Sequence, residues 1–530
     1  MVDILSFISF LWLIRTLKAV LFWVYIWQLK EYHIGRFIDH FRTKKGKKIL
    51  LNYLLLFKFF LFVLIFFNFN IAAYLLVATY IAEVILFIGR GYKGPVFTFK
   101  AMVLSFVCFT VVILFWLFSY KLGNSNFIIS LISFDILAPV IFTAIILLFE
   151  PIAVAMRSNT IERATQKMLK HKDLKVIAIT GSYGKTTTKE FLATILSSKF
   201  NVLHTKDHKN SEMGVSQTIL NDLDEKHEVF IVEMGAYVKG GIKLLCDMVK
   251  PEIGMVTGVN EQHLATFGSM ENLLSAEGGY ELLESLKKEG LLVVNGDNKY
   301  CVDLYKKAHI NKKIYSVNND KVDSDVFAKE ITVEEHSLDF MVMTKEKETA
   351  HVNMHVLGKQ NIQNLLGAIL IAMELGMSLE EVSKASKNIK EVQAGITFKK
   401  GIHSLNIIDS SYSSNPDGVI ADLDYLNIFK GKKIVVMPCL IELGDKATDI
   451  HIKIGKKISE VCDMAIITTR DKFKELKDEA VKNGMNADKV IFCENASEIF
   501  QLVTTSFRNN DTVLLEGRVP KDLLRLLIGK

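Results

Sequence analysis

The residues with the clearest chemical potential form one short stretch, Thr180-Gly181-Ser182-Tyr183-Gly184-Lys185-Thr186-Thr187. A β-branched apolar run precedes this stretch, and helix-forming sequence follows it. The backbone N–H groups of a glycine turn at a helix N-terminus bind anionic oxygens, and the helix dipole adds to the attraction. In such a turn the lysine neutralises the terminal phosphates of a nucleotide, and the next hydroxyl ligates Mg²⁺. The predicted nucleotide ligands are Thr180, Gly181, Ser182, Gly184, Lys185, Thr186 and Thr187.

A second chemical group is the carboxylate of Glu233, near the end of the apolar run 229–234. A carboxylate that ends a buried strand opposite a phosphate loop is a typical Mg²⁺ ligand. Glu233 and Thr186 are therefore predicted metal ligands. The loop itself is of a short type, because the usual phosphate-loop pattern has a glycine five residues before Gly184, where this chain has Ile179.

These groups need a scaffold, and the chain beyond residue 174 alternates between short apolar runs and helical patterns. Such alternation predicts a mostly parallel sheet with helices on both faces. Residues 310–356 are polar and alternating, which suggests an antiparallel edge or an insertion, and 358–375 has the apolar face of a helix. A second α/β domain follows a boundary near 398–402. The expected strands are 176–180, 229–234, 253–259 and 291–295, then 404–409, 433–438, 463–468, 489–493 and 512–516.

The first 150 residues differ in composition from the rest. Half of the 530 residues are apolar, and the excess lies at the front. Five apolar stretches there approach the roughly 20 residues that cross a bilayer core. These stretches are 4–28, 50–67, 70–90, 101–120 and 127–149. A helix at 152–170 leads away from them. The predicted fold class is a multi-span α-helical membrane domain (1–150) followed by two α/β domains: a phosphate-loop domain (151–400) and a Rossmann-like C-terminal domain (401–530).

Charge supports a membrane and a direction. Residues 1–150 hold 14 Lys/Arg and 6 Asp/Glu, whereas the remaining residues hold 50 and 52. Basic charge confined to the apolar part favours a membrane surface and argues against a nucleic acid partner. The 29–49 loop has seven basic residues, and the 91–100 loop has Lys93 and Lys100, so both are expected in the cytoplasm. We expect a multi-pass cell-membrane protein with its N-terminus outside and its catalytic domains in the cytoplasm.

Five charges lie within or near the expected spans: Arg15, Lys18, Lys58, Glu83 and Asp135. Charges at that depth are costly and are usually paired or functional. Two interpretations stay open. In the first, their side chains snorkel toward the membrane interface or form ion pairs of the Lys58–Glu83 kind that determine helix packing. In the second, they form a site for the head group or prenyl chain of a membrane lipid.

Further motifs accompany the phosphate loop. They are KNSEMGV (209–215), VEMGA (232–236), the His263 stretch (250–273), GKQNIQN (358–364), IIDSSYSSNPDG (407–418) and IELG (441–444) followed by His451. With the loop TGSYGKTTT they resemble the Mur ligase family, ATP-dependent amide-forming enzymes of cell-wall precursor synthesis. Within that family the similarity is to the D-alanyl-D-alanine-adding branch, and it covers about residues 174–520.

The resemblance implies ATP and Mg²⁺ as cofactors and assigns roles by position. Glu233 would hold Mg²⁺, and His263 would orient metal and nucleotide. Asn361 and Asn364 would face the nucleotide, and Asp409 would contact the ribose. The catalytic set implied is Lys185, Glu233, His263 and Glu277, and the metal set is Thr186, Glu233, His263 and Glu277.

Four departures from the family pattern stand out. Glu277 takes the place of a lysine that is carbamylated in the family and bridges two Mg²⁺ ions. We expect the Glu277 carboxylate to replace the carbamate as a metal ligand. The alternative is that Glu277 is a surface carboxylate on a helix. A family arginine is absent after Gly395, where Lys399 and Lys400 are the nearest bases. Glu516 replaces the lysine of a terminal Lys-Gly-Ser motif. The five apolar stretches stand where the family has its UDP-sugar-binding domain.

The family reaction activates a substrate carboxylate as an acyl phosphate, which an amine then attacks. We expect a membrane-anchored ligase that joins a cell-wall precursor carboxylate to an amino acid or dipeptide amine. Two alternatives remain: a membrane-bound synthase of a poly-γ-glutamate type of polymer, and a nucleotide-binding scaffold that has lost ligation. The missing arginine and the substituted lysine favour the scaffold alternative.

Overall fold

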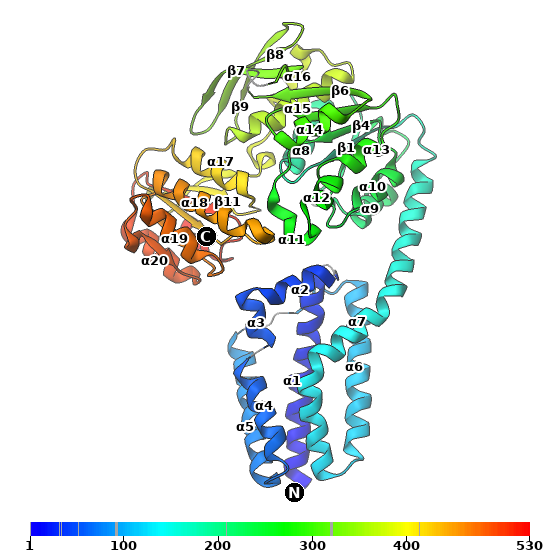
Figure 1. Ribbon diagram of the computed structural model, residues 1–530, viewed down its shortest axis with the longest axis vertical. Helices are drawn as coiled ribbons and strands as arrows, with labels where there is room; N and C mark the ends of the chain where they lie inside the picture. Colours follow the sequence, from blue (N-terminus) through cyan, green and yellow to red (C-terminus); the bar gives the residue numbers. More distant parts are fainter. Residues whose placement is uncertain are drawn as a thin grey trace. The chain divides into compact units, whose positions relative to one another are not determined.

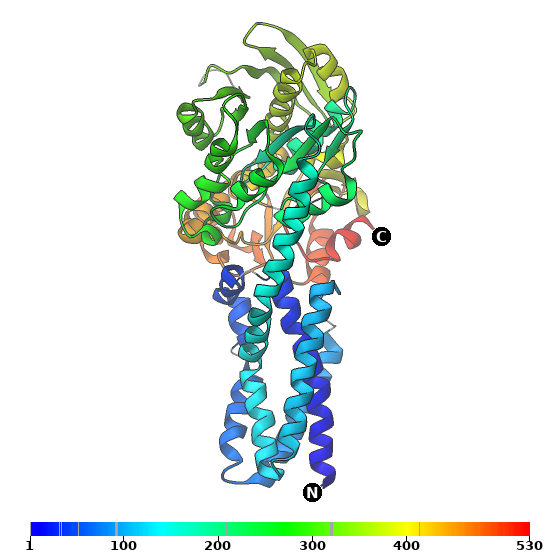
Figure 2. The ribbon, with the colours of Figure 1, turned by 90° about the vertical axis from the view of Figure 1, so that its right-hand side faces the viewer.

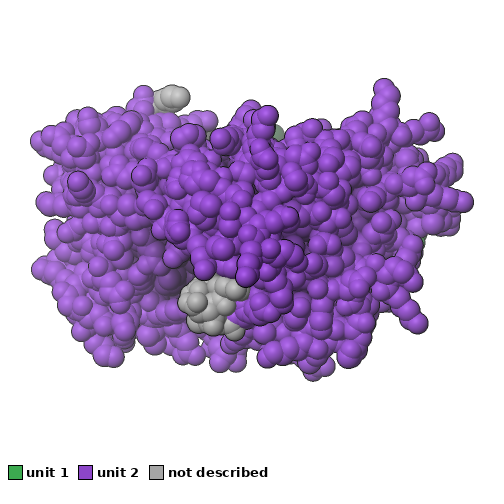
Figure 3. Space-filling model, turned by 90° about the horizontal axis from the view of Figure 1, so that it is seen from above, with its two compact units in different colours: residues 1–159 green, residues 160–530 purple. Residues whose placement is uncertain are grey.

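The computed structural model describes residues 2–30, 32, 34–50, 52–90, 94–207, 209–317, 322–412 and 414–529. The chain forms two compact units, 1–159 and 160–530, each of which is described by itself (Figure 1). Figure 3 views the surface of the second unit in purple. The predicted domain boundaries at residues 150 and 400 stay predictions. The first compact unit ends at residue 159, nine residues after the first of these boundaries. Lys93, which was predicted to lie in a cytoplasmic loop, is outside the described residues.

The first unit is helical. Its helices are α1 (Val2–Leu29), α2 (Ile34–Arg42), α3 (Lys44–Leu50), α4 (Tyr53–Leu64), α5 (Phe69–Arg90), α6 (Phe99–Tyr120) and the first part of α7 (Asn124–Met168). Helix α1 packs against both α5 and α6 (Figures 1 and 2). The basic segment after α1 contains two short helices, and Phe37 of α2 stacks on Trp27 of α1 with ring centroids 4.0 Å apart.

Among the described residues, four helices are long and apolar enough to cross a membrane: Ile4–Leu29, Phe69–Leu86, Phe99–Tyr120 and Ser125–Met168. The expected span at 50–67 was wrong in length, because α4 has only 12 residues. At 1.5 Å per residue it is about 18 Å long, well short of a bilayer core of roughly 30 Å. The spans expected at 127–149 and the helix at 152–170 are one continuous helix, α7, with Pro139 and Pro151 inside it.

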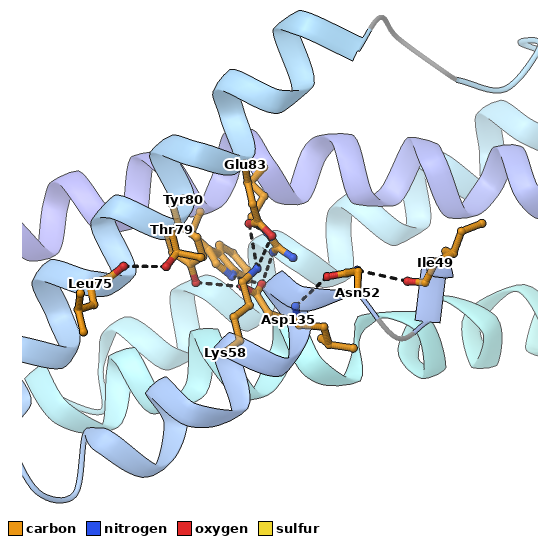
Figure 4. A network of polar contacts seen from close by, with 11 residues as sticks. Ile49, Asn52, Lys58, Leu75, Thr79, Tyr80, Glu83 and Asp135 are labelled. Carbon is orange, nitrogen blue, oxygen red and sulfur yellow. Dashed lines mark hydrogen bonds and ion pairs between the residues drawn. The ribbon is translucent and has the colours of Figure 1, made fainter. Parts of the chain in front are cut away.

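A buried network of charges joins four of these helices (Figure 4). Lys58 of α4 donates to both oxygens of Glu83 of α5, at 2.8 and 2.9 Å. Its Nζ also lies 3.1 Å from Oδ2 of Asp135 of α7, and Tyr80 donates to the same oxygen at 3.0 Å. Arg15 of α1 pairs with both carboxylates. Two positive and two negative charges therefore compensate one another, which confirms the ion-pair interpretation for these four residues.

Replacing Asp135 by asparagine should destabilise the helical unit by about 3–5 kcal/mol, because two buried cations lose a shared partner. The Asp135 side chain is fully buried and accepts from Arg15, Trp12 and Tyr80. Thermal unfolding of the detergent-solubilised chain measures the loss. The matched control is Glu150→Gln, whose ion pair with Lys100 is partly exposed and should cost about 1 kcal/mol or less. Equal unfolding temperatures for the two variants would contradict this.

The second unit contains two sheets. The first has the order β2-β3-β1-β4-β5-β6-β7-β8-β9. Its strands are β1 (Lys175–Thr180), β2 (Val202–His204), β3 (Val229–Glu233), β4 (Ile253–Val256), β5 (Leu291–Asn295), β6 (Asn311–Ser316), β7 (Val326–Val333), β8 (Leu338–Thr344) and β9 (Thr349–Met354). Strands β2 to β6 pair in parallel with β1 at the centre, and β7, β8 and β9 pair antiparallel. The expected parallel sheet and antiparallel edge are thus confirmed.

Helices cover both faces of this sheet. They are α8 (Lys185–Leu196), α9 (Glu212–Asp222), α10 (Gly241–Val249), α11 (Leu264–Phe267), α12 (Met270–Ala276), α13 (Tyr280–Ser285), α14 (Lys299–Lys307), α15 (Gln360–Glu374) and α16 (Leu379–Ser386). Successive side chains of β1 point to opposite faces. Ile177 and Ile179 join the core beneath α8 and α15, whereas Val176 and Ala178 join the core beneath α9, α10 and α14. The sheet therefore positions the residues that follow β1 at its carboxyl edge.

The second sheet has the order β10-β11-β15-β12-β13-β14 and is parallel except for β10. Its strands are β10 (Thr397–Lys400), β11 (Asn406–Ser410), β12 (Lys433–Met437), β13 (Met464–Ile467), β14 (Val490–Phe492) and β15 (Thr512–Glu516). The helices are α17 (Pro416–Leu426), α18 (Ala447–Val461), α19 (Phe473–Lys482), α20 (Ala496–Ser506) and α21 (Leu523–Ile528). One hydrophobic core includes side chains from both sheets, so the two α/β lobes pack together. The two α/β lobes were expected from the sequence.

Candidate functional site

The phosphate loop connects β1 to α8, as the sequence predicted. Gly181 has φ +136°, and Gly184 has φ +77° and immediately precedes the first helical residue, Lys185. These left-handed conformations favour glycine, because a Cβ would meet neighbouring atoms. The chain therefore turns sharply at the carboxyl edge of the sheet and presents the N-terminus of a 12-residue helix. This is the arrangement that binds phosphate oxygens.

Two side chains of the loop are suited to an anionic ligand. The Lys185 ammonium folds back over the loop and donates to the carbonyls of Gly181 and Ser182. These contacts lie within its own loop, so the ammonium can turn to phosphate oxygens without breaking the hydrophobic core. Thr180 Oγ1 is buried and has no hydrogen-bond partner among the residues that the structure describes. A buried hydroxyl without a partner is costly, and a ligand at the loop would satisfy it.

Glu233 lies beside the loop, because β3 pairs with β1. Its Oε1 accepts from Thr186 Oγ1 at 3.1 Å and from Asn210 Nδ2 at 2.9 Å. Its Oε2 lies 3.2 Å from the ammonium of Lys189. The carboxylate, the hydroxyl and the amide oxygen are the ligand types that Mg²⁺ takes. Sequence reasoning found Glu233 and Thr186 but assigned no role to Lys189 or Asn210, although Lys189 follows Lys185 by one helical turn.

Glu277 and His263 follow β4 in the sequence, and β4 pairs with β1 on the edge opposite β3. Glu277 is 1% exposed and accepts from Ser182 Oγ at 2.9 Å, and its other oxygen lies 2.9 Å from His263 Nδ1. Burial opposes its ionisation, but His263, Lys185 and the Ser182 hydroxyl outweigh burial and hold the pKa of the Glu277 carboxyl below its usual value. The alternative of a surface carboxylate was therefore wrong, because Glu277 bonds the phosphate loop directly.

The four predicted metal ligands thus form two pairs, Thr186 with Glu233 and His263 with Glu277. Among the described residues, no group of three or more His, Cys, Asp or Glu side chains could hold a metal ion. Each pair contacts the loop segment at one residue, Glu277 at Ser182 and Glu233 at Thr186. A metal held by Thr186 and Glu233 fits the donor set observed.

The start of α15 lies against the loop. Asn364 Oδ1 accepts from Thr188 Oγ1 at 3.3 Å, and Asn364 Nδ2 donates to Asn361 Oδ1 at 3.0 Å. Asn361 in turn donates to the carbonyl of Leu357 at 2.6 Å. Asn364 is therefore brought to the loop, whereas Asn361 is buried behind it and bonds Asn364 and Leu357. That either faces the nucleotide stays a prediction. A Cβ on Gly184 would come 2.6 Å from Asn364 Oδ1, so this approach requires glycine.

Substituting Gly184 by alanine should weaken nucleotide binding by about tenfold or more. The left-handed backbone at this position would cost roughly 1–2 kcal/mol for alanine, and the added Cβ would displace Asn364. The matched control is Gly376→Ala, which has a similar φ, +85°, and open space around its Cβ. Both variants should lose similar thermal stability, but only Gly184→Ala should lose affinity for ADP in calorimetry. Equal affinities in the two variants would remove Asn364 from the site.

Asp409, which was expected to contact the ribose, bonds two side chains of its own lobe. It lies at the end of β11, where Lys399 Nζ donates to its Oδ2 at 2.6 Å and Ser411 Oγ to its Oδ1 at 2.5 Å. Burial works against the charge, yet these bonds hold the pKa of the Asp409 carboxyl below its usual value. Its place at the ribose stays a prediction.

His451 is fully buried, and both of its ring nitrogens hydrogen-bond to the backbone, Nε2 to the N–H of Leu440 and Nδ1 to the carbonyl of Ala447.

The other substituted position, Glu516, is buried at the end of β15. Burial and then the adjacent Asp422 carboxylate raise the pKa of Glu516 well above its usual range, and the two groups hydrogen-bond. Asp422 also accepts from Ser410 at 2.5 Å and from Gln360 of the first lobe at 2.8 Å. The replaced lysine position is therefore part of a contact between the lobes.

A second contact between the lobes begins at the His263 segment. Asn260 Nδ2 donates to Asn415 Oδ1 at 3.0 Å and to Asp417 Oδ2 at 2.9 Å. The backbone N–H of Ala265 donates to the carbonyl of Glu442 at 3.0 Å. Sequence reasoning missed Asn260, because nothing in its neighbourhood indicates a partner 155 residues later in the chain. The arrangement brings a segment of the second lobe to the edge of the phosphate-loop site.

The two α/β lobes that carry this site are similar to domains of known proteins. Residues 179–372 match the Mur ligase middle domain, and residues 396–519 match the domain described as Mur ligase, glutamate ligase domain. The chain is 28% identical over 282 residues to the UDP-N-acetylmuramoyl-tripeptide–D-alanyl-D-alanine ligase of Escherichia coli, and 27% identical over 348 residues to that of Haemophilus influenzae. A crystal structure of MurF from Acinetobacter baumannii has a TM-score of 0.63 and 26% identity.

The coverage of these matches is partial. The E. coli alignment covers 53% of this chain and 61% of that enzyme, and the H. influenzae alignment covers 65% and 73%. The A. baumannii structure matches 71% of this chain and 81% of its own. The two matched domains contain the phosphate loop, both carboxylates and the contacts between the lobes.

Proposed function

This chain belongs to the Mur ligase family, and we propose that it is a MurF-type, ATP-dependent ligase that joins a cell-wall precursor carboxylate to an amine. The observation that carries the proposal is the phosphate loop with an acidic residue on each side, Glu233 and Glu277. The relatives' printed names support a muramoyl-peptide acid and a D-alanyl-D-alanine amine as substrates. The amine is therefore an amino acid or a dipeptide.

The residues fit ATP and Mg²⁺ on observations of this structure: the glycine turn, the unpartnered Thr180 hydroxyl and the oxygen donors around Glu233, all among the described residues. When bound, ATP supplies the phosphoryl group that activates the carboxylate as an acyl phosphate, and Mg²⁺ offsets the charge of that group. Lys185 and the backbone N–H groups of the loop bind phosphate oxygens. Thr186 and Glu233 would hold the metal, and His263 with Glu277 would orient the reacting end of the nucleotide.

Hydrogen bonds connect the two lobes at this edge. Asn260 and Gln360 of the first lobe bond Asp417 and Asp422 of the second. Since the activated carboxylate is sensitive to hydrolysis, a closed arrangement protects it until the amine arrives. The second lobe would bring that amine.

We also propose that the first unit anchors the enzyme in the cell membrane, with the α/β lobes in the cytoplasm. Four helices have the length and composition for it, and the seven basic residues of the 29–49 segment would lie on the cytoplasmic side. Helices α4 and α5 form an antiparallel pair joined by a turn at the end of the bundle near the N-terminus (Figure 1). The proposed orientation needs an odd number of crossings, so the segment 52–67 must supply a fifth beside the four long helices. Its short helix α4 is paired with α5 through Lys58 and Glu83.

Cysteine labelling in intact cells checks this orientation. An impermeant reagent should label Asn68→Cys and Gly123→Cys, which lie in uncharged or weakly charged turns. It should leave Lys45→Cys and Gly94→Cys unlabelled until the cells are opened. Labelling of Lys45→Cys from outside would overturn the orientation.

The test of the function is ADP release by the detergent-solubilised full chain with a panel of muramoyl-peptide acids and amines. Amine-dependent ADP release with one discrete amide product supports the proposal. A polydisperse product would identify a polymer synthase of the poly-γ-glutamate type instead. Nucleotide binding without amine-dependent ADP release over the whole panel would identify a non-ligating scaffold.

A further inference from the structure

Lys189 is a fully buried lysine that the proposed chemistry does not yet use. Its side chain has 0% exposure, and it lies in the second turn of α8. Burial disfavours a cation, and so does the positive end of the helix dipole. Lysine is almost never fully buried unless it is paired. The position therefore requires a strong compensating interaction.

The compensation comes from three oxygens. Lys189 Nζ lies 3.2 Å from Glu233 Oε2 and 3.3 Å from Glu190 Oε1, and it donates to the carbonyl of Asp207 at 3.3 Å. The Glu190 side chain is 23% exposed, whereas that of Glu233 is 2% exposed. Water screens the first pair more than the second. Glu233 is therefore the principal counter-charge of Lys189.

This pairing divides the two oxygens of Glu233 between two sets of partners. Oε2 pairs with Lys189, whereas Oε1 accepts hydrogen bonds from Thr186 and Asn210. Thr186 directly follows the phosphate-loop lysine. Lys189 also bonds the carbonyl of Asp207, in the segment that leads to Asn210. One ammonium thus restrains both the carboxylate and the segment that carries its amide partner.

We propose that Lys189 is a positioning residue that restricts a divalent cation to a single oxygen of Glu233 and limits how tightly the site holds that cation. Its ammonium occupies Oε2 and repels a cation at Oε1, so the metal is bound through one carboxylate oxygen and held less tightly. This inference rests on the proposed nucleotide site, but it does not depend on which amide is formed.

The experiment measures metal binding directly, with Mn²⁺ as the probe and ADP present, by electron paramagnetic resonance on the solubilised full chain. Lys189→Met should bind Mn²⁺ about tenfold more tightly or better, because a nearby buried positive charge is removed. Its ATP turnover should fall, since Glu233 is no longer held at Oε2. Lys189→Arg keeps the charge and should restore the parent's Mn²⁺ affinity. Lys199→Met, an exposed lysine of the same region, is the control.

The outcomes separate the two proposals. A parent chain that binds no Mn²⁺ with ADP would overturn the nucleotide site and this inference with it. A parent that binds Mn²⁺, together with Lys189→Met of equal or weaker affinity, would overturn this inference alone. If Lys189→Met does not fold, Lys189→Gln and Lys189→Arg are compared, and equal Mn²⁺ affinity in those two variants would also overturn it.

Discussion

Lys185→Ala should lower ATP turnover about a thousandfold or more while the chain stays folded, since the charge that neutralises the transferred phosphoryl group is lost. The fold should survive because the Lys185 ammonium bonds carbonyls of its own loop, at Gly181 and Ser182. ADP release measures turnover, and thermal unfolding measures stability. The unfolding temperature of the variant should therefore stay near that of the parent.

The control for this variant is Lys199→Ala, which removes a lysine from the end of the same helical region. Lys199 is 40% exposed and donates to the carbonyl of Gly376, far from the loop in the sequence. It should leave turnover unchanged. Product formation at the parent's rate by Lys185→Ala would remove the phosphate-loop assignment and with it the proposed function.

Glu277→Gln should lower Mg²⁺-dependent turnover by about a hundredfold and affect ATP binding much less. The parent should be indifferent to bicarbonate. The sequence resemblance puts Glu277 at the position of a carbamylated lysine of the family, and we propose that its carboxylate supplies the negative oxygen pair without CO₂. In the structure one of its oxygens accepts from Ser182 of the phosphate loop and the other faces His263. Glutamine has nearly the same size, so the variant removes the charge and keeps the shape.

Glu281→Gln is the matched control, because Glu281 is also a buried carboxylate and lies four residues further along the chain. Its oxygens accept from the backbone N–H groups of Gly240 and Lys243, not from the loop. It should lose stability but keep its Mg²⁺ dependence. Two results would exclude the role of Glu277: parent activity that collapses in CO₂-free buffer and returns with bicarbonate, or full activity of Glu277→Gln.

Much of the fold was predictable because its signals are local. The phosphate loop is contiguous, and the apolar runs of the two sheets are short and bounded. The five parallel strands of the second sheet therefore lie within one or two residues of their expected positions, whereas β10, at the expected domain boundary, was not predicted. The helical unit was less predictable. The 50–67 stretch is apolar throughout, but hydropathy does not reveal that its helix has only 12 residues.

The sequence by itself determined the two α/β lobes, the phosphate loop with Lys185 and Thr186, and the apolar helices, because periodicity and short spacing express them directly. Only the tertiary structure decided which distant side chains meet. The sheet order β3-β1-β4 brings Glu233 and Glu277 to opposite sides of the loop, and it pairs Glu277 with Ser182, 95 residues away. That order is chosen by the packing of whole elements, so no local pattern records it.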